Sequence, residues 1–296
     1  MKYKIYGGLM AIALAIGISS CSEDIPEQDN SEDADRMKIE FSFSHPDATR
    51  ATESAFETGD VVGVFLCESH LPLETGGNVL NNEKLRFNGS TWATSLPAYW
   101  DRGLYNVYAY YPYKNNIESI SDLSFEVERD QSGITSTGMN GYEASDFMFA
   151  SGKSITASAS PVPLNFKHIM SKLTIRLIKG EEYEGELPST ATVVLHNVAT
   201  KATIDLAAGV ATKDMYAEPK SIIARQASAT SYTAIVVPQR IDNRVPLVEV
   251  IINDISYMFE SKFQFKAGMH HIVSMVIEAS PEQTKIDIGG EITNWN

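Results

Sequence analysis

The sequence predicts an all-β protein built from two tandem β-sandwich domains, and three observations support this prediction. Short apolar segments with period-two alternation recur from residue 37 onward. Gly, Asn, Asp and Pro separate them, as in "FNGS", "AAGV" and "FKAG". No segment shows the long 3.6-residue period of an amphipathic helix. About 260 residues of this kind exceed one ordinary sandwich core, so we expect two domains.

Residues 1–20 have the pattern of a secretory signal peptide. "MKYK" supplies a positive start, and "IYGGLMAIALAIGI" is an apolar run of the length expected for such a signal. "GISSC" then resembles the lipobox of bacterial lipoproteins, which implies cleavage before Cys21 and lipidation of that cysteine. The alternative is a plain secretory signal followed by an incidental cysteine.

Residues 21–36 are expected to form a lipidated acidic tether. "SEDIPEQDNSEDAD" is acidic and nearly free of large apolar side chains. Acidic residues after a lipidated cysteine also resemble surface-export signals of Gram-negative gut anaerobes, which implies display on the outer membrane. The whole chain carries a formal net charge of -14, which argues against nucleic-acid binding.

The first strand is expected in "KIEFSFS", where Ile39, Phe41 and Phe43 share one face. The connector "SHPDATRATES" follows, with Arg50 among small and polar residues. Such a segment is typical of an exposed, extended connection that a protease could reach.

Further strands are expected on both sides of a domain boundary near residue 160. "DVVGVFL" and "LYNVYAYYPY" precede it, the latter ending at Pro112. The boundary lies within residues 150–163, which are rich in Ser and Ala, so the domains are 37–160 and 161–296. "KLTIRLI" opens the second domain with Leu173, Ile175 and Leu177 on one face. The later strands are expected in "TVVLHNV", "YTAIVVP", "LVEVIIN", "ISYMF", "HHIVSMVIE" and "KIDI".

The tyrosine-rich segment allows two interpretations. Alternation places Tyr108 and Tyr110 on one face of the strand and Tyr111 and Tyr113 on the other. Exposed rings could form a platform for a sugar ligand, whereas buried rings would belong to the core. The pattern favours packing and leaves the platform open.

The chain contains no recognisable catalytic, cofactor or metal motif, and we predict that it is not an enzyme. Cys67 follows an apolar run and is expected to be a buried small residue. His270 and His271 are neighbours on a predicted strand, so their rings should point to opposite faces and not share a metal. "DQSG" at residues 130–133 could hold a nucleophile, but a turn is the favoured interpretation.

Several segments in order resemble the fimbrillin family of type V pilus subunits and fimbrial tip lipoproteins. They are "FETGDVVGVFL", "YNVYAYYPY", "DQS", "ASDFMFA", "LNFKHIMSKLTI", "IVVPQ" and "ITNWN". The resemblance covers residues 37–296. It implies two transthyretin-like β-sandwich domains, no enzyme activity, and a pilus subunit or tip adhesin that assembles by protease-triggered donor-strand exchange.

That mechanism gives Arg50 a role, because a trypsin-like, Arg-specific protease would cleave between Arg50 and Ala51. The strand with Ile39, Phe41 and Phe43 would then be a placeholder that leaves its groove to a strand of another pilus subunit. Cleavage at Arg36 would spare this strand. The C-terminal "TKIDIGGEITNWN" is either a donor strand or the last strand of the second domain.

The alternative function is a monomeric surface lipoprotein that binds a glycan or a host protein. Limited proteolysis separates the two, since only the pilus function predicts a discrete product beginning at Ala51.

Overall fold

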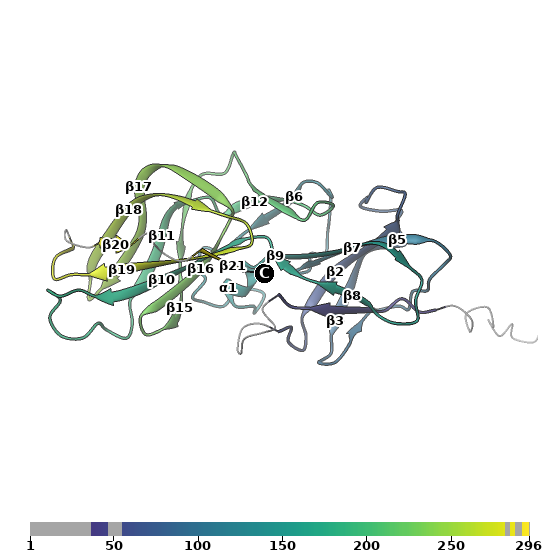
Figure 1. Cartoon of the computed structure of the whole chain (residues 1–296), viewed down its shortest axis with the longest axis horizontal. Coiled ribbons are helices and arrows are strands. Elements are labelled where there is room, and N and C mark those ends of the chain that lie inside the picture. The colour runs from purple at the N-terminus through teal and green to yellow at the C-terminus, as the bar shows by residue number, and fades with distance from the viewer. Residues whose placement is uncertain (1–36, 47–54, 282–284, 288–291, 296) are drawn as a thin grey trace, which may run out of the picture. The chain divides into compact units, whose positions relative to one another are not determined.

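The computed structural model describes residues 37–46, 55–281, 285–287 and 292–295, and strands dominate this part of the chain (Figure 1). The all-β prediction is confirmed. One short helix that the sequence analysis did not predict, α1 (Gly141–Ala144), interrupts the strands. Asn140 caps it by accepting a hydrogen bond from the backbone N–H of Tyr142. At four residues, α1 is too short to leave a periodic pattern in the sequence.

The strands are named in chain order. Those of the N-terminal half are β1 (Phe41–Ser44), β2 (Val61–Glu68), β3 (Leu80–Phe87), β4 (Trp92–Ala93), β5 (Leu104–Tyr111), β6 (Leu123–Glu126), β7 (Met148–Thr156), β8 (Val162–Asn165) and β9 (Lys167–His168). Those that follow are β10 (Ser171–Lys179), β11 (Thr192–Val198), β12 (Lys201–Asp205), β13 (Val210–Lys213), β14 (Lys220–Ile223), β15 (Arg225–Ser228), β16 (Ser231–Val236), β17 (Gln239–Ile252), β18 (Ile255–Phe265), β19 (Met269–Ile277), β20 (Lys285–Asp287) and β21 (Ile292–Asn294).

The first large sheet has the order β4-β3-β2-β5-β7-β9 and is covered on both faces. Val62, Val64 and Leu66 of β2 share a core with the residues of β1 and β8. Phe65 and Cys67 of the same strand point into the second, larger core. Burial on both faces explains why β2 is a continuous apolar run instead of an alternating one.

Two further sheets pack around the larger core. One sheet has the order β15-β16-β10-β19-β20, with β21 also on β19, and the other has the order β14-β11-β17-β18. Leu173, Ile175 and Leu177 of β10 are buried in this core, as the alternation predicts. β10 pairs with β16 antiparallel and with β19 parallel. These layers surround the core as a β-sandwich.

Several strand pairs join the part of the chain before residue 160, the predicted domain boundary, to the part after it. β8 pairs with β1, β9 pairs with β7, and β12 pairs with β6. Residues 37–296 therefore belong to one compact unit. The Ser- and Ala-rich segment 150–163 consists mostly of β7 and β8, because strand pairing uses the backbone and small side chains do not prevent it. The boundary itself stays a prediction.

Candidate functional site, the groove that holds strand β1

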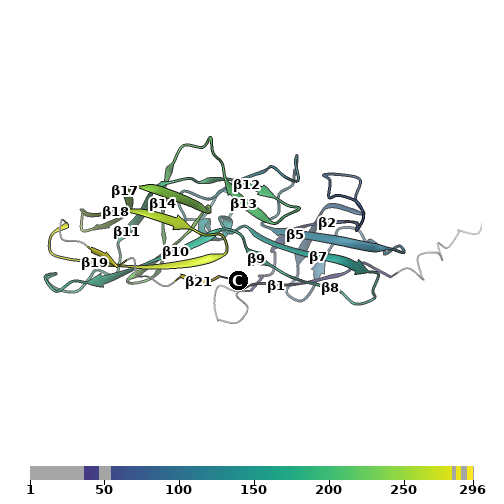
Figure 2. The ribbon, with the colours of Figure 1, turned by 45° about the horizontal axis from the view of Figure 1, so that its top comes forward.

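Strand β1 and the residues just before it lie between two partners that come from distant parts of the chain. Figure 2 shows the first of them, β8, beside β1. On one edge β1 pairs parallel with β8, with Phe41 opposite Val162 and Ser44 opposite Asn165. Two backbone hydrogen bonds flank this ladder, from Val162 N–H to the Glu40 carbonyl at 2.8 Å and from Phe166 N–H to the Ser44 carbonyl at 3.0 Å.

The other edge of the segment is also hydrogen-bonded. Ile39 N–H donates to the Ala98 carbonyl at 2.8 Å, and Trp100 N–H donates to the Met37 carbonyl at 2.8 Å. Lys38 forms an antiparallel bridge with Tyr99. Residues 37–44 thus occupy a slot between β8 and residues 98–100, and their departure would leave backbone groups on both walls without partners. We call this slot the β1 groove.

The three side chains predicted to plug a groove do lie together in it. Ile39 is 3% exposed and Phe41 is 5% exposed, and both belong to the core beneath β2 and β5. Phe43 is partly buried and packs against the same core. The regular strand begins at Phe41 and not at Lys38, because residues 37–39 bond to residues 98–100 and the contact with β8 begins only at the Glu40 carbonyl.

Aromatic rings wall the end of the groove that holds Phe43. The Phe43 ring meets Trp92 edge-on at 5.0 Å between centroids and Phe166 edge-on at 5.5 Å. It stacks on Phe41 at 5.8 Å. Phe56 in turn contacts Trp92 and Phe166. Edge-to-face contacts of this kind add to the stabilisation from burial alone.

Beyond Phe43, three segments from different parts of the chain meet at His168. The ring centroid of His45 lies 5.7 Å from that of His168. Asp146 is hydrogen-bonded to His168 Nδ1 at 2.8 Å. The indole of Trp295 stacks on the imidazole, with 3.8 Å between centroids and 3° between planes. One cluster next to the end of β1 therefore contains residues of "ASDFMFA", "LNFKHIMSKLTI" and "ITNWN".

Carboxyl groups gather close to this end of the groove. Burial is the main cause of the raised pKa of Asp60, and the charge of Glu57 adds to it. The Tyr111 hydroxyl donates to Asp60 Oδ1 at 3.5 Å. The pKa of Glu143 is also raised, first by burial and then by Glu57, Asp60 and Asp146. The aromatic end of the groove therefore lies beside a negative field.

The C-terminal segment is hydrogen-bonded to β19. Ile286 of β20 is opposite Met275, and Thr293 of β21 is opposite His270. Trp295 N–H donates to the Gly268 carbonyl at 2.9 Å, and its side chain is buried. Of the two possibilities that the sequence left open, the structure has the segment paired within its own chain.

Other predicted site residues fall outside the described part of the chain. Cys21, the predicted lipidation site, is among them, and so are Arg50 and Ala51, which flank the predicted cleavage point. Their roles stay predictions.

Tyr108 and Tyr110 do not form an exposed platform. Tyr108 is 6% exposed and Tyr110 is 1% exposed, and both face the larger core. The Tyr110 hydroxyl donates to Asn82 Oδ1 at 2.6 Å. Lys153 Nζ lies over the Tyr108 ring, 3.9 Å from its centroid. The ligand interpretation of these two rings is therefore wrong, because the second β layer covers the face on which they lie.

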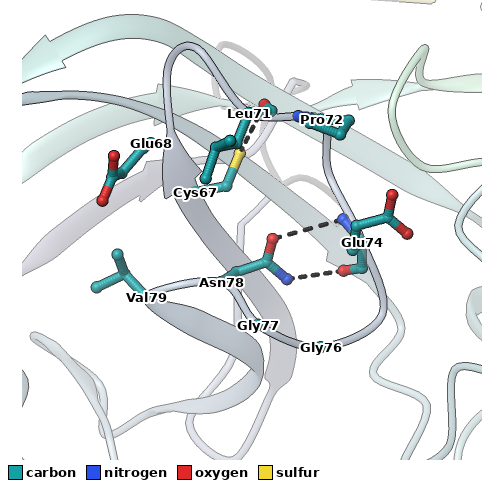
Figure 3. A pocket seen from close by; sticks show the side chains of 9 residues that line it. All are labelled: Cys67, Glu68, Leu71, Pro72, Glu74, Gly76, Gly77, Asn78 and Val79. Atoms are coloured by element: carbon teal, nitrogen blue, oxygen red, sulfur yellow. Dashed lines mark hydrogen bonds between the residues drawn. The ribbon is translucent and has the colours of Figure 1, made fainter.

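A small pocket lies beside the loop between β2 and β3 (Figure 3). Its volume is about 280 Å³, and its lining includes Cys67, Glu68, Glu74 and Asn78. Asn78 links the loop by bonding to both the backbone N–H and the carbonyl of Glu74. Burial raises the pKa of the Cys67 thiol, so it stays protonated and unreactive. The Cys67 thiol donates instead to the Leu71 carbonyl, with 3.9 Å between sulfur and oxygen.

A line of polar side chains crosses the outer face of the sheet that contains β11 and β17. His196 is hydrogen-bonded to Ser221 Oγ at 2.9 Å and to Glu249 Oε2 at 2.8 Å, and Ser256 Oγ donates to the other carboxylate oxygen at 2.6 Å. Sequence reasoning missed this line, since its members are on four strands. The chemistry resembles a catalytic triad, but the residues lie across neighbouring strands of a sheet and do not line the pocket of Figure 3.

The "DQSG" segment is a structural turn, as favoured. Asp130 Oδ1 accepts hydrogen bonds from the backbone N–H and the hydroxyl of Ser132. Gln131 is fully buried and exchanges two hydrogen bonds with the backbone of Ile235 in β16, at 2.7 and 2.8 Å. The family-like "DQS" therefore has a packing role.

Within the described ranges, no three His, Cys, Asp or Glu side chains converge as a metal site would require. His271 instead accepts a hydrogen bond from Lys266 N–H, and His270 bonds to Thr174. None of the helices in the part of the chain that the structure covers has the length and hydropathy of a membrane span.

Comparisons with known proteins agree with one another. A family model described as fimbrillin-like matches residues 49–295. A relative from Bacteroides ovatus, described as a candidate fimbrium tip subunit named Fim1C, is 25% identical over 197 residues. The match covers 60% of this chain and only 35% of that relative.

Two crystal structures of candidate cell adhesion proteins share the fold. The one from Bacteroides uniformis has a TM-score of 0.67 at 18% identity, covering 89% of this chain and 99% of its own. The one from Bacteroides ovatus has a TM-score of 0.66 at 18% identity, covering 88% of this chain and 98% of its own.

Proposed function

The chain belongs to the fimbrillin-like family, and on that premise we propose that it is a subunit of a surface pilus that assembles by exchange of strand β1. The family comprises fimbrial and adhesion proteins, not enzymes. The observation that carries the proposal is the β1 groove, in which residues 37–44 are hydrogen-bonded on both edges and bury Ile39 and Phe41.

The exchange begins with hydrolysis of the peptide bond between Arg50 and Ala51 by an Arg-specific, trypsin-like protease. Water is consumed, Arg50 gains a carboxylate and Ala51 becomes the new N-terminus. The strand is then held only by non-covalent contacts. A strand from another subunit can therefore compete for the groove, because neither strand is covalently attached to it. Before cleavage the connector "SHPDATRATES" links β1 covalently to the rest of the chain. This link keeps the effective concentration of β1 at the groove high, so that the groove stays filled.

The energetic scale agrees with such an exchange. Burial of Ile39, Phe41 and much of Phe43 contributes roughly 5–8 kcal/mol before ordering costs. Leaving the groove empty would also expose the backbone groups of Ala98, Trp100 and β8. An empty groove is therefore unfavourable, whereas a substitute strand with similar apolar spacing recovers most of the loss.

We further propose that the subunit sits at the tip of the pilus. Pairing of β20 and β21 with β19 keeps the C-terminal segment within its own chain, where it is not offered to a neighbour. The family relative from Bacteroides ovatus is described as a candidate tip subunit, which supports the same position. A tip subunit would also be the one to contact a host protein or glycan.

Export completes the proposal. Cys21 would be lipidated and would anchor the precursor in the outer membrane until the protease acts. The acidic residues 22–35 would hold the folded part away from the membrane surface.

N-terminal sequencing after mild proteolysis tests the mechanism. The full chain, purified in detergent and treated with an Arg-specific protease, should give a discrete product beginning at Ala51 and form complexes with a pilus subunit. Arg50→Gln should block both, whereas Arg36→Gln should block neither. Filaments from intact bacteria that still carry residues 37–50 covalently attached would contradict the mechanism, and scattered nicking would favour the monomeric binding protein.

A further inference from the structure

The β1 groove offers three unequal positions to a strand. Ile39 and Phe41 fill the first two, which are buried among aliphatic and mixed side chains. The third position, filled by Phe43, is walled by the edges and faces of Trp92 and Phe166. An aromatic ring at the third position gains two edge-to-face contacts that an aliphatic side chain cannot form.

The groove also fixes the direction and register of its occupant. β8 accepts a parallel partner, with Phe43 opposite Leu164, and residues 98–100 accept the upstream part in antiparallel register. A shift by one residue would turn the apolar side chains to the solvent face. The occupant that gains the most contacts is therefore apolar at two alternate residues and aromatic at the next alternate residue.

The chain's own C-terminal segment matches only the first part of this pattern. "KIDIGG" at residues 285–290 aligns with "KIEFSF" at residues 38–43, so Ile286 and Ile288 correspond to Ile39 and Phe41. Gly290 corresponds to Phe43, and it has no side chain to place among the rings. Glycine also loses more conformational freedom than other residues when it is held in a strand.

We propose that the β1 groove selects a strand from a different pilus protein, one with an aromatic residue at the third position, and discriminates against the C-terminal segment of a second copy of this chain. This inference rests on the proposed strand exchange and adds the chemistry of the partner. It predicts a mixed assembly, in which this subunit receives a strand but does not polymerise with itself.

A peptide competition experiment tests the selectivity. The full chain in detergent is cleaved between Arg50 and Ala51 and incubated with a labelled peptide of residues 37–46, MKIEFSFSHP, whose entry is followed by fluorescence anisotropy. Unlabelled competitors carry Phe43→Tyr, Phe43→Leu, Phe43→Gly or Ser42→Gly. The last is the matched control, since Ser42 is exposed and its replacement adds glycine without removing a ring. The peptide TKIDIGGEIT, residues 284–293, is compared with its Gly290→Phe variant.

We expect Phe43→Tyr to compete like the native peptide and Phe43→Leu to compete about three- to tenfold more weakly, the range that aromatic pairs contribute. Phe43→Gly should fall at least about tenfold below Ser42→Gly, because it also loses buried apolar area. TKIDIGGEIT should compete weakly, and Gly290→Phe should restore most of the binding.

Three results would overturn the inference. Equal competition by the Phe43→Leu peptide and the native peptide would remove the aromatic selectivity while leaving strand exchange intact. Competition by TKIDIGGEIT at the native level would remove the discrimination against self. Failure of the labelled native peptide to enter the cleaved protein at all would overturn strand exchange and the selectivity with it.

Discussion

At the scale of single residues, Gln131 illustrates how a buried polar side chain takes the place of a backbone segment. Its amide donates to and accepts from the backbone of Ile235, as the next residue of a strand would. Every polar atom of that amide is satisfied, so its complete burial costs little. In the sequence, Gln131 is one polar residue in a turn, and its role depends on β16, which lies far along the chain.

Gly63 is required by the close approach of Tyr110 on the neighbouring strand. A Cβ at residue 63 would lie 2.3 Å from the tyrosine ring, which is buried and anchored through its hydroxyl to Asn82. We expect Gly63→Ala to lower the free energy of unfolding by about 1–3 kcal/mol, as overpacking does. Urea denaturation would measure it.

Gly76 provides the control for this substitution. Nothing lies within 4 Å of a Cβ built there, so Gly76→Ala should leave the stability unchanged or slightly raised. Equal effects of the two substitutions would contradict the packing argument.

The Glu249 carboxylate, which is hydrogen-bonded to His196 and Ser256, should make the stability of the protein depend on pH in acid. Hydrogen bonds from Ser256 and then His196 lower its pKa in the folded protein. Its contribution to stability is therefore fully present above the unfolded pKa, near 4.5, and is lost as the pH falls through the lower folded value. We expect Glu249→Gln to destabilise the protein by about 1 kcal/mol at pH 7 and progressively less on acidification.

Thermal or urea unfolding at several pH values between 3 and 7 would check this. Glu181→Gln, at an exposed position after β10, is the control and should leave the free energy of unfolding near that of the unaltered chain. A Glu249→Gln deficit that persisted unchanged in acid would exclude the carboxylate as its source.

At the scale of elements, strand β1 contributes stability out of proportion to its length. Phe41 is buried in the core beneath β2, so Phe41→Ala in the uncleaved chain should cost about 3–5 kcal/mol. Ser42→Ala, on the exposed side, should cost almost nothing. Hydrogen exchange of the Trp100 and Phe166 amides, which bond to this segment, should increase only in the first variant. Loss of stability without that local effect would place the role of Phe41 elsewhere.

Runs of apolar residues, alternating in some strands and continuous in β2, predicted ten of the described strands and missed others such as β3 and β12. β1, β2, β5 and β10 lie where the pattern indicates, since each buries one or both faces in a core. Residues 150–163, where the sequence predicts the domain boundary, lie mostly in β7 and β8, because the backbone of β7 pairs with β5 whatever its side chains are. The plug residues Ile39, Phe41 and Phe43 were found from the sequence, whereas the walls of the groove were not. Those walls come from residues 98–100 and β8, and only the tertiary fold brings them together.

At the scale of the whole molecule, the cluster around His168 ties the end of β1 to the C-terminal segment. Trp295 stacks on His168, which also contacts His45 and Asp146. We expect Trp295→Ala to release β21 from β19 and lower the free energy of unfolding by about 3 kcal/mol. Hydrogen exchange at residues 269–271 would report the release.

Ile292→Ala is the matched control, because this residue of β21 is exposed. It should leave both the stability and the exchange rates near those of the unaltered chain. Protection at residues 269–271 that survived Trp295→Ala would show that the backbone pairing alone holds the segment.

The parallel pairing of β10 with β19 bears on the order in which the protein folds. Lys172 lies opposite His270, and the chain between them forms strands β11 to β18. Contacts between residues so far apart in the sequence carry a large loop-closure penalty and slow the search for the native state. Newly made copies should therefore spend an appreciable time with β10 uncovered on one side, and a holding chaperone that binds unpaired strands would protect them during that interval.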